Sequence, residues 1–374
     1  MIFALAAAVA LAYQLIALFA VLRHRRQRDA PSARFPPVSV LKPLYGLDPG
    51  FARAARSHAT QQYPDFEILF GVRDPGGPEA AVVDQLQHEF SGTAIRSIVC
   101  RTAAQNGKVG ALIDLAREAR GDILVINDSD IIVSPDYLRR VIAPLEDARV
   151  GVVTCLYRAS ADTIPGRWEA LGIAAGFAPG VLVAPLVGVK DIGLGATLVV
   201  RASDLHRAGG FEALADYLAD DNVLARNIAG LGLRVHLSDV VVETHLGAPG
   251  WRHAWRRQLR WFRTIRVTNR SGYAGLPLTF AAMWALPAVG TGQWWLAALV
   301  LIVRLAAVVA TGKRLACPVT SRWWWLAPIR DITNAILWIA ALTGDTVEWR
   351  GQHLRLDRTG RIVGVQSVEP VSSR

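Results

Sequence analysis

Two carboxylates stand one residue apart, at Asp128 and Asp130, directly after the apolar run Ile123–Ile126. This run is rich in isoleucine and valine and predicts a buried strand. Carboxylates at the end of such a strand can face one divalent cation, which prefers oxygen ligands and bridges diphosphate oxygens. An aspartate-rich turn explains the same spacing equally well.

Two further acidic positions follow predicted element boundaries. Asp74 comes after the β-rich run Glu67–Val72 and could accept a hydrogen bond from a base or ribose, although its Asp-Pro-Gly turn accounts for it equally well. Asp220 and Asp221 open a helix-like run. Both could cap that helix, and a carboxylate there could instead act as general base for an acceptor hydroxyl.

The basic, tryptophan-rich stretch 252–266 contains Arg257, Arg260 and Trp261 in the order RxxRW. Arginines three positions apart share one face of a helix, so their guanidinium groups could clamp a diphosphate. A membrane-surface helix whose arginines reach towards water is the alternative. The sequence contains no zinc-binding spacing and no serine or cysteine nucleophile motif, so covalent catalysis has no support.

These residues can act together only if the ends of the strands that carry them lie side by side in one sheet. Short β-rich runs alternate with helix-like stretches at about 50–61, 78–90 and 107–120, and the runs are Val38–Leu41, Glu67–Val72, Arg96–Val99 and Ile123–Ile126. Alternation of this kind predicts an α/β fold with a mostly parallel sheet and helices on both faces. Ligands of such sheets bind at the carboxyl ends of the strands.

Composition indicates a membrane protein with a large soluble part. The 374 residues are 52% hydrophobic, include 12 Trp and carry a net charge of +10. Basic residues cluster beside apolar runs, which favours attraction to a membrane surface, and no nucleic-acid-binding motif accompanies the charge. Only four of the 41 basic residues are Lys, a bias that we associate with GC-rich bacterial genomes.

The apolar run from Ile2 to Leu22 is long enough to cross a bilayer, and arginines follow it. We therefore predict an uncleaved anchor that begins outside the cell and leads into a cytoplasmic domain, with residues from about 24 to 274 inside. Apolar segments return at 276–290 and 294–311, which suggest a membrane hairpin. A third, at 323–343, contains charged residues and could span or lie along the interface.

Residues 171–200 are apolar and glycine-rich but contain Pro179 and Pro185. Because proline breaks long helices, we expect a buried strand-and-loop region or a lipid-facing groove here in preference to a spanning helix.

Taken together, these features resemble the ceramide glucosyltransferase family, whose members are inverting transferases with a GT-A, nucleotide-sugar-binding fold. The resemblance runs from Val38 to Trp261. It rests on residues 38–44, Asn106-Gly107-Lys108-Val109, Asp128-Ser129-Asp130, Ala208-Gly209-Gly210-Phe211, Asp220-Asp221 and the RxxRW motif at 257–261. Asp220 stands where related transferases often carry Glu.

The resemblance implies roles for particular residues. Asp221 would be the catalytic base, and Asp130 would hold Mg²⁺ or Mn²⁺. The donor nucleotide and its diphosphate would be bound by Asp74, Asp128, Lys108, Arg257, Arg260 and Trp261.

The resemblance also implies a UDP-sugar donor, carrying glucose or N-acetylglucosamine, and a lipid hydroxyl acceptor on ceramide or a hopanoid. The enzyme would be a multi-pass protein of the bacterial inner membrane with a cytoplasmic catalytic domain. A processive polysaccharide synthase would need more membrane helices than the sequence provides. A non-enzymatic membrane-surface binding protein would leave the strand-end carboxylates without a purpose.

The predicted organisation has five parts. These are an anchor at 1–23, a GT-A domain with transmembrane helices on both sides at 36–250, an interfacial RxxRW segment at 251–274, transmembrane or interfacial helices at 275–344, and a polar tail at 345–374.

Overall fold

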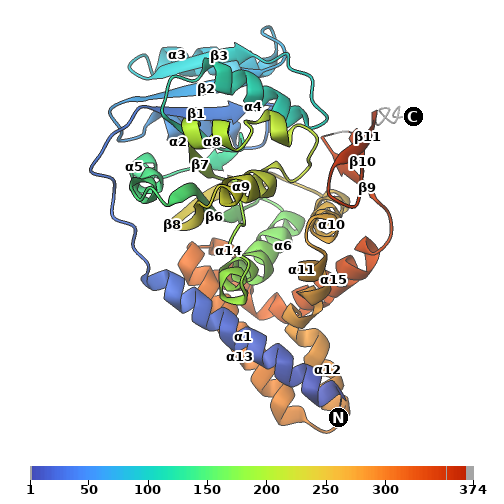
Figure 1. The fold of residues 1–374 in the computed structure, drawn as a ribbon. Coiled ribbons are helices and arrows are strands. Elements are labelled where there is room, and N and C mark those ends of the chain that lie inside the picture. The colour runs from blue at the N-terminus through green and yellow to red at the C-terminus, as the bar shows by residue number, and fades with distance from the viewer. Residues whose placement is uncertain (1, 351, 368–374) are drawn as a thin grey trace. The chain divides into compact units, whose positions relative to one another are not determined.

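The computed structural model describes residues 2–350 and 352–367, and the chain divides into two compact units. The helical unit comprises residues 1–25, 160–187 and 248–374. The sheet unit comprises residues 26–159 and 188–247. The elements of both units are labelled in Figure 1.

The sheet unit is built on an eight-stranded sheet with the strand order β3-β2-β1-β4-β7-β6-β8-β5. Its strands are β1 (Val38–Pro43), β2 (Phe66–Val72), β3 (Ala94–Val99), β4 (Ile123–Ile126), β5 (Ile131–Ile132), β6 (Val150–Ser160), β7 (Leu198–Arg201) and β8 (Arg234–His245). The first four strands are parallel, as the sequence predicted. The antiparallel part, in which β7 pairs with β4 and β6 and β5 pairs with β8, was not predicted.

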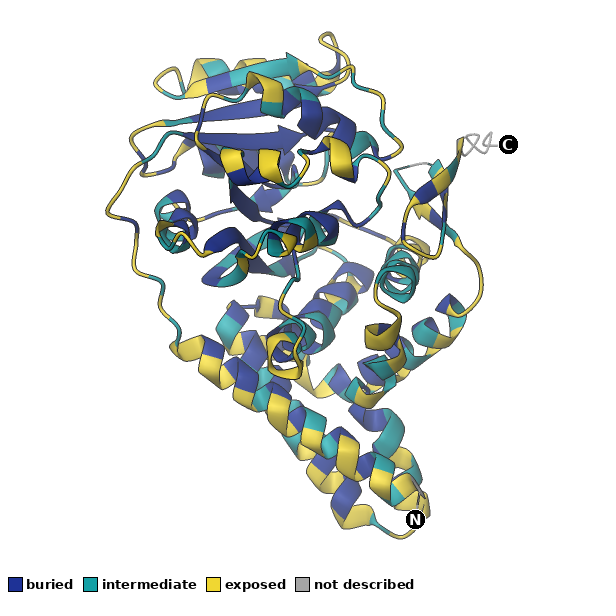
Figure 2. Ribbon diagram, viewed as in Figure 1, coloured by how far each residue is buried: buried dark blue, intermediate teal, exposed yellow. Residues whose placement is uncertain are grey.

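Helices cover both faces of this sheet. They are α2 (Phe51–Ala59), α3 (Pro78–Glu89), α4 (Gly107–Glu118), α5 (Tyr137–Ile142), α8 (Ala202–Arg207) and α9 (Asp220–Gly230), with 3₁₀ turns η1 (Ala143–Glu146) and η4 (Glu212–Leu214). Successive residues of a strand point to opposite faces, so Val40 belongs to the core under α2 and α3, whereas Leu41 belongs to the core under α4 and α9. Figure 2 shows the central strands as deeply buried.

The helical unit contains the long apolar helices and a small sheet. Its elements are α1 (Ile2–Arg26), α6 (Ile164–Gly172), the π-turn η2 (Ile173–Phe177), α7 (Ala178–Val183), η3 (Ala184–Val187), α10 (Trp251–Thr268), α11 (Arg270–Thr279), α12 (Ala281–Gly290), α13 (Trp294–Leu315), α14 (Pro318–Trp323), η5 (Trp324–Leu326), α15 (Ala327–Ala341), β9 (Thr346–Trp349), β10 (Gln352–Leu356) and β11 (Ile362–Ser367).

Three helical stretches among the described residues are long and apolar enough to cross a membrane: Phe3–Arg26, Ile164–Val187 and Trp294–Leu315. A fourth results if α11 and α12, which meet at a bend of 50°, count as one broken span. The segment predicted at 323–343 forms α14, η5 and α15. With 15 residues, α15 is about 22 Å long, which is shorter than the hydrocarbon core of a bilayer.

The expectation of strand and loop at 171–200 was wrong for residues 171–187, which stay helical, and correct for residues 188–200, which form a loop and enter β7. Pro179 has no N–H to donate to the carbonyl of Ala175, and a π-turn forms just before it. The guanidinium of Arg304 donates to that carbonyl instead, at 2.7 Å. The helical run therefore continues through Pro179, and an arginine from α13 satisfies the orphaned oxygen.

Within the helical unit, α1 and α13 run in the same direction. Ala7, near the start of α1, packs in one cluster with Leu296 and Val300, near the start of α13. At the other ends, Arg314 Nε donates to His24 Nδ1 at 3.0 Å. Figure 1 shows the two helices side by side.

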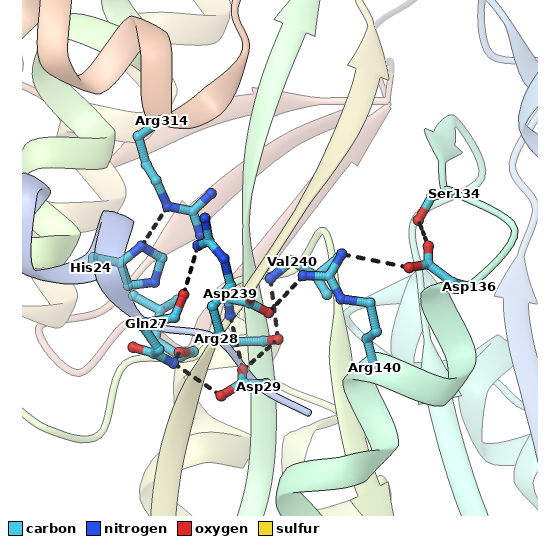
Figure 3. Close-up of polar contacts among 12 residues, drawn as sticks. His24, Gln27, Arg28, Asp29, Ser134, Asp136, Arg140, Asp239, Val240 and Arg314 are labelled. Carbon is cyan, nitrogen blue, oxygen red and sulfur yellow. Dashed lines mark hydrogen bonds and ion pairs between the residues drawn. The ribbon is translucent and has the colours of Figure 1, made fainter. Parts of the chain in front are cut away.

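The segment that follows α1 is bound to β8 (Figure 3). Asp29 accepts hydrogen bonds from His236 Nε2 at 3.1 Å and from the backbone N–H of Asp239 at 3.0 Å. Gln27 donates to the carbonyl of Leu237 at 3.0 Å. Burial alone would raise the pKa of Asp29, but the hydrogen bonds from His236 and Asp239 lower it. These contacts, which we call the Asp29 clasp, hold the segment on β8. The Asp29 carboxylate is ionised in this arrangement.

Candidate active site

Because β1, β2 and β4 are parallel, the residues that follow them lie at one edge of the sheet. Lys42, near the end of β1, is fully buried, and its Nζ donates to the carbonyl of Asp128 at 3.1 Å. Burial lowers the pKa of Lys42 to about 7, although Asp130 and Asp128 oppose that shift. A buried lysine thus supports the backbone between the two carboxylates.

Lys108 links the carboxylates of two separate elements. Its Nζ lies 2.9 Å from Asp128 Oδ1 and 3.4 Å from Asp220 Oδ2. Burial alone would lower the pKa of Lys108, but Asp128 and Asp220 raise it overall, so the ammonium stays charged. The start of α4 is fixed by Asn106, whose side chain accepts from the N–H of Lys108 at 3.0 Å.

Asp221 lies in the first turn of α9, beside the glycine loop that precedes β7. A Cβ atom added to Gly195 would be 3.2 Å from Asp221 Oδ2, 3.7 Å from Lys108 Nζ and 3.8 Å from Asp128 Oδ2. The three polar groups therefore converge on the backbone of Gly195. Burial, with the neighbouring charge of Asp220, raises the pKa of Asp221 to about 6.

The same loop packs against the backbone of α9. A Cβ added to Gly193 would be only 2.2 Å from the carbonyl oxygen of Asp221. Glycine is required here, because real Cβ atoms do not approach so closely.

Asp130 follows β4 and contacts β8. The hydroxyl of Thr244, in β8, donates to its carboxylate. Burial, with the charge of Asp128, raises the pKa of Asp130 to about 6. Within residues 2–350 and 352–367, no group of three or more His, Cys, Asp or Glu side chains is arranged to hold a metal ion. A hard cation held by Asp130 would take its remaining ligands from phosphate oxygens and water, which is a usual arrangement for Mg²⁺.

Asp74 lies in the exposed turn after β2, where its Oδ1 accepts from the N–H of Gly76 at 2.9 Å. The neighbouring Arg73 lies over the ring of Tyr45, 4.4 Å from its centroid. Arg73 also lines a cavity of about 250 Å³, together with Cys100, residues 101–104, Gly107 and Ala111. The cavity lies among the ends of β2 and β3 and the start of α4.

Arg257, Arg260 and Trp261 lie on α10 in the helical unit, whereas all the other predicted site residues lie in the sheet unit. Arg257 Nη2 forms an ion pair with Glu169 of α6 at 2.6 Å, and the Glu169 side chain is fully buried.

Sequence reasoning missed Lys42, Gly193 and Gly195 as parts of this cluster. Lys42 carries a signal of its own, since a lysine at the end of an apolar strand is seldom buried without partners. Gly193 and Gly195 carry no such signal in the sequence, because their contacts with α9 depend on tertiary packing.

The sequence and the fold are both similar to those of known proteins. Residues 2–362 match Glycosyl transferase family 21. The chain is 23% identical over 368 residues to ceramide glucosyltransferase 1 of Caenorhabditis elegans, which covers 93% of this chain and 78% of that protein. It is 20% identical over 362 residues to ceramide glucosyltransferase 3 of the same organism, covering 91% and 77%.

Among solved structures, the fold is similar to that of the mannosyltransferase PcManGT from Pyrobaculum calidifontis in complex with GDP-Man and Mn²⁺. The TM-score is 0.53 at 23% identity, over 90% of this chain and 98% of that one. The fold is therefore GT-A-like, as predicted.

Proposed function

The chain belongs to glycosyl transferase family 21, and from this membership we propose that it moves glucose or N-acetylglucosamine from a UDP-sugar to the hydroxyl of ceramide or a hopanoid. The relatives named as ceramide glucosyltransferases support a lipid acceptor. The observation that carries the proposal is the convergence of Asp128, Lys108 and Asp221 on Gly195.

We propose that the donor nucleotide binds along the ends of β1, β2 and β4. Asp74 and Asp128 contact the nucleotide, with the base entering the cavity beside Arg73, and Lys108 neutralises charge on the diphosphate side. Asp130 holds Mg²⁺ or Mn²⁺, which supplies charge neutralisation for the departing diphosphate when bound. The mannosyltransferase of similar fold was solved with GDP-Man and Mn²⁺, which supports a nucleotide-sugar donor and a divalent cation in the proposal.

Asp221 is proposed as the general base in a single displacement. It takes the proton of the lipid hydroxyl while that oxygen forms a bond to the anomeric carbon. The bond from the anomeric carbon to the diphosphate oxygen breaks on the opposite face, so the configuration inverts. Its raised pKa, about 6, suits a carboxylate that must accept a proton near neutral pH.

Arg257, Arg260 and Trp261 keep the role that the family resemblance gives them, which is to act on the donor diphosphate. Because Arg257 is paired with buried Glu169, we propose that Glu169 orients this guanidinium. The enzyme is proposed to reside in a bacterial inner membrane, with its catalytic residues in the cytoplasm.

The test is transfer by the full chain in proteoliposomes that contain either ceramide or a hopanoid. UDP-glucose and UDP-N-acetylglucosamine are supplied separately, and products are identified by mass spectrometry and their anomeric configuration by NMR. We expect one lipid to gain one glucose or one N-acetylglucosamine with inversion, and Asp221→Asn to serve as the inactive control. Polymeric sugar products, or retention of configuration, would contradict the proposal.

A further inference from the structure

The backbone at Gly195, on which the carboxylates converge, belongs to a tight turn. The N–H of Thr197 donates to the carbonyl of Leu194 at 3.1 Å, so residues 194–197 form a β-turn that leads into β7. Thr197 is fully buried, and Ala196 is 6% exposed. Because these residues are shielded from water, the polar groups of the turn need partners within the protein.

One partner is Thr154 of β6, which bonds both ends of the turn. Its Oγ1 accepts from the N–H of Leu194 at 3.1 Å and donates to the carbonyl of Thr197 at 2.9 Å. Thr154 is 1% exposed and lies opposite Leu198 in the ladder between β6 and β7. A single hydroxyl thus fastens the first and the last residue of the turn to the sheet.

The second partner is Asn127, which directly precedes Asp128. Its Nδ2 donates to the carbonyl of Ala196 at 2.8 Å and to the hydroxyl of Thr197 at 3.0 Å. Its Oδ1 accepts from the hydroxyl of Tyr137, in α5, at 3.3 Å. Asn127 and Tyr137 are both fully buried. The amide of Asn127 therefore joins the turn to the backbone beside Asp128.

The same turn contacts groups on both sides of the proposed reaction. A Cβ added to Gly195 would lie 3.2 Å from Asp221 Oδ2 and 3.8 Å from Asp128 Oδ2. Just before the turn, Gly193 packs against the carbonyl of Asp221. Because these contacts are made by the backbone, a shift of the turn would change the position of Asp221 relative to Asp128.

We propose that Thr154 and Asn127 are positioning residues for the transfer reaction. By fixing the turn at residues 194–197, they set the separation between Asp128, on the donor side, and Asp221, which takes the proton of the acceptor. Both act through the turn and not on the substrates themselves. The inference rests on the proposed function, because it adds residues to the site of that reaction.

The test compares Thr154→Val with Thr154→Ser in the full chain, reconstituted in proteoliposomes. Valine keeps the shape of the side chain but bonds neither end of the turn. The kcat should therefore fall by about tenfold to a hundredfold, because misplacing catalytic groups by about 1 Å costs up to that much. Serine keeps the hydroxyl and should restore most of kcat. The Kd for UDP, measured by titration calorimetry, should stay unchanged in both variants.

Ser39→Ala is the matched control for the loss of a buried hydroxyl. Ser39 is fully buried and lies near the start of β1, whereas the carboxylates lie beyond the strand ends. Its Oγ accepts from the N–H of Gly121 at 2.8 Å and donates to Glu67 at 2.7 Å, so it makes the same kinds of bond as Thr154. Ser39→Ala should lower the thermal stability but leave kcat unchanged.

Asn127→Ala tests whether the two residues act through one turn. The double variant Asn127→Ala/Thr154→Val should lose less kcat than the product of the two single losses, because either change alone already releases the turn. A double loss equal to that product would show two independent effects and contradict the proposal.

The Thr154 variants decide the question even if Asn127→Ala fails to fold. Native kcat in Thr154→Val would overturn the inference and leave the proposed function standing. So would a kcat loss that Ser39→Ala matches, or one accompanied by an equal weakening of UDP binding. A native chain that neither binds UDP nor transfers sugar to any lipid would instead overturn the proposed function.

Discussion

The two adjacent carboxylates at the start of α9 have different surroundings. Asp220 is buried and lies 3.4 Å from the ammonium of Lys108, so it belongs to an ion-pair network. Asp221 has its Oδ2 near Gly195 and its pKa raised to about 6. The spacing of the sequence could not distinguish them, whereas their contacts favour Asp221 as base and Asp220 as a positioning residue.

Asp221→Asn should lower kcat by roughly 10² to 10⁴ while the donor still binds, because a general base contributes about that much and the amide keeps the shape. Steady-state turnover and a donor-binding titration measure the two effects. Asp220→Asn should be milder. Normal turnover in Asp221→Asn together with a dead Asp220→Asn would move the base by one residue, and normal turnover in both would leave only a capping role.

The rate should also depend on pH in a defined direction. A base acts in its deprotonated form, so kcat should fall by about tenfold per pH unit below pH 6, near the pKa of Asp221. Because the charge of Asp220 contributes to that raised pKa, Asp220→Asn should move the acid limb to lower pH. A pH profile of kcat from pH 5 to 8 checks this, and an acid limb that stays in place would speak against Asp221 as the titrating group.

At the scale of elements, α4 and the loop before β7 are what bring the polar groups together. Asn106 caps α4, is completely buried, and donates from its amide to the carbonyl of Tyr217 at 2.8 Å. One side chain therefore fixes both the start of the helix that carries Lys108 and the segment that leads into α9.

Asn106→Ala should lower stability by about 1–2 kcal/mol, because it removes the cap, and it should also lower kcat by displacing Lys108. Thermal unfolding and turnover of the same preparation measure both. Asn269→Ala is the matched control, since Asn269 caps α11 by accepting from the N–H of Gly272 at 2.8 Å, far in sequence from the carboxylates. It should lose stability but keep kcat. Equal kcat losses in both variants would show that general destabilisation explains the effect.

The parallel half of the sheet could be predicted from the sequence, because β1 to β4 are apolar runs whose pairing follows from alternation with helices. The antiparallel half could not. β7 has only four residues and lies between β4 and β6, so its position depends on contacts with strands distant in sequence. The helical run through Pro179 was also unpredictable, because the donor that satisfies Ala175 comes from residue 304. The strand-end aspartates were identifiable, whereas Gly193 and Gly195 were not.

At the scale of the whole molecule, the sheet limits the path of the chain through a membrane. Residues 164–187 are apolar enough to span, yet the strands before and after them, β6 and β7, pair in one sheet. Both ends of the segment must therefore lie on the same side, and a single crossing is excluded. In the helical unit, α1 and α13 run in the same direction, so the residues after α13 lie on the side reached at the end of α1.

This arrangement predicts on which side of the membrane each loop lies. In a cysteine-free background, Thr291→Cys should react with an impermeant thiol reagent in intact cells, whereas Asp84→Cys and Arg358→Cys should react only after permeabilisation. All three positions are exposed. Labelling of Asp84→Cys in intact cells would reverse the proposed orientation, and labelling of Arg358→Cys alone would contradict the parallel course of α1 and α13.

The Asp29 clasp also bears on which lipids the proposed transfer uses. Only Gln27 and Arg28 separate the end of α1 from Asp29, and three peptide steps span at most about 11 Å. With α1 in a bilayer, this short connection keeps Asp29 beside that bilayer, and we expect the proposed transfer to draw its acceptor from the same membrane. In mixed vesicles, glycosylated lipid should accumulate only in those that carry the enzyme. Product in enzyme-free vesicles would refute this expectation.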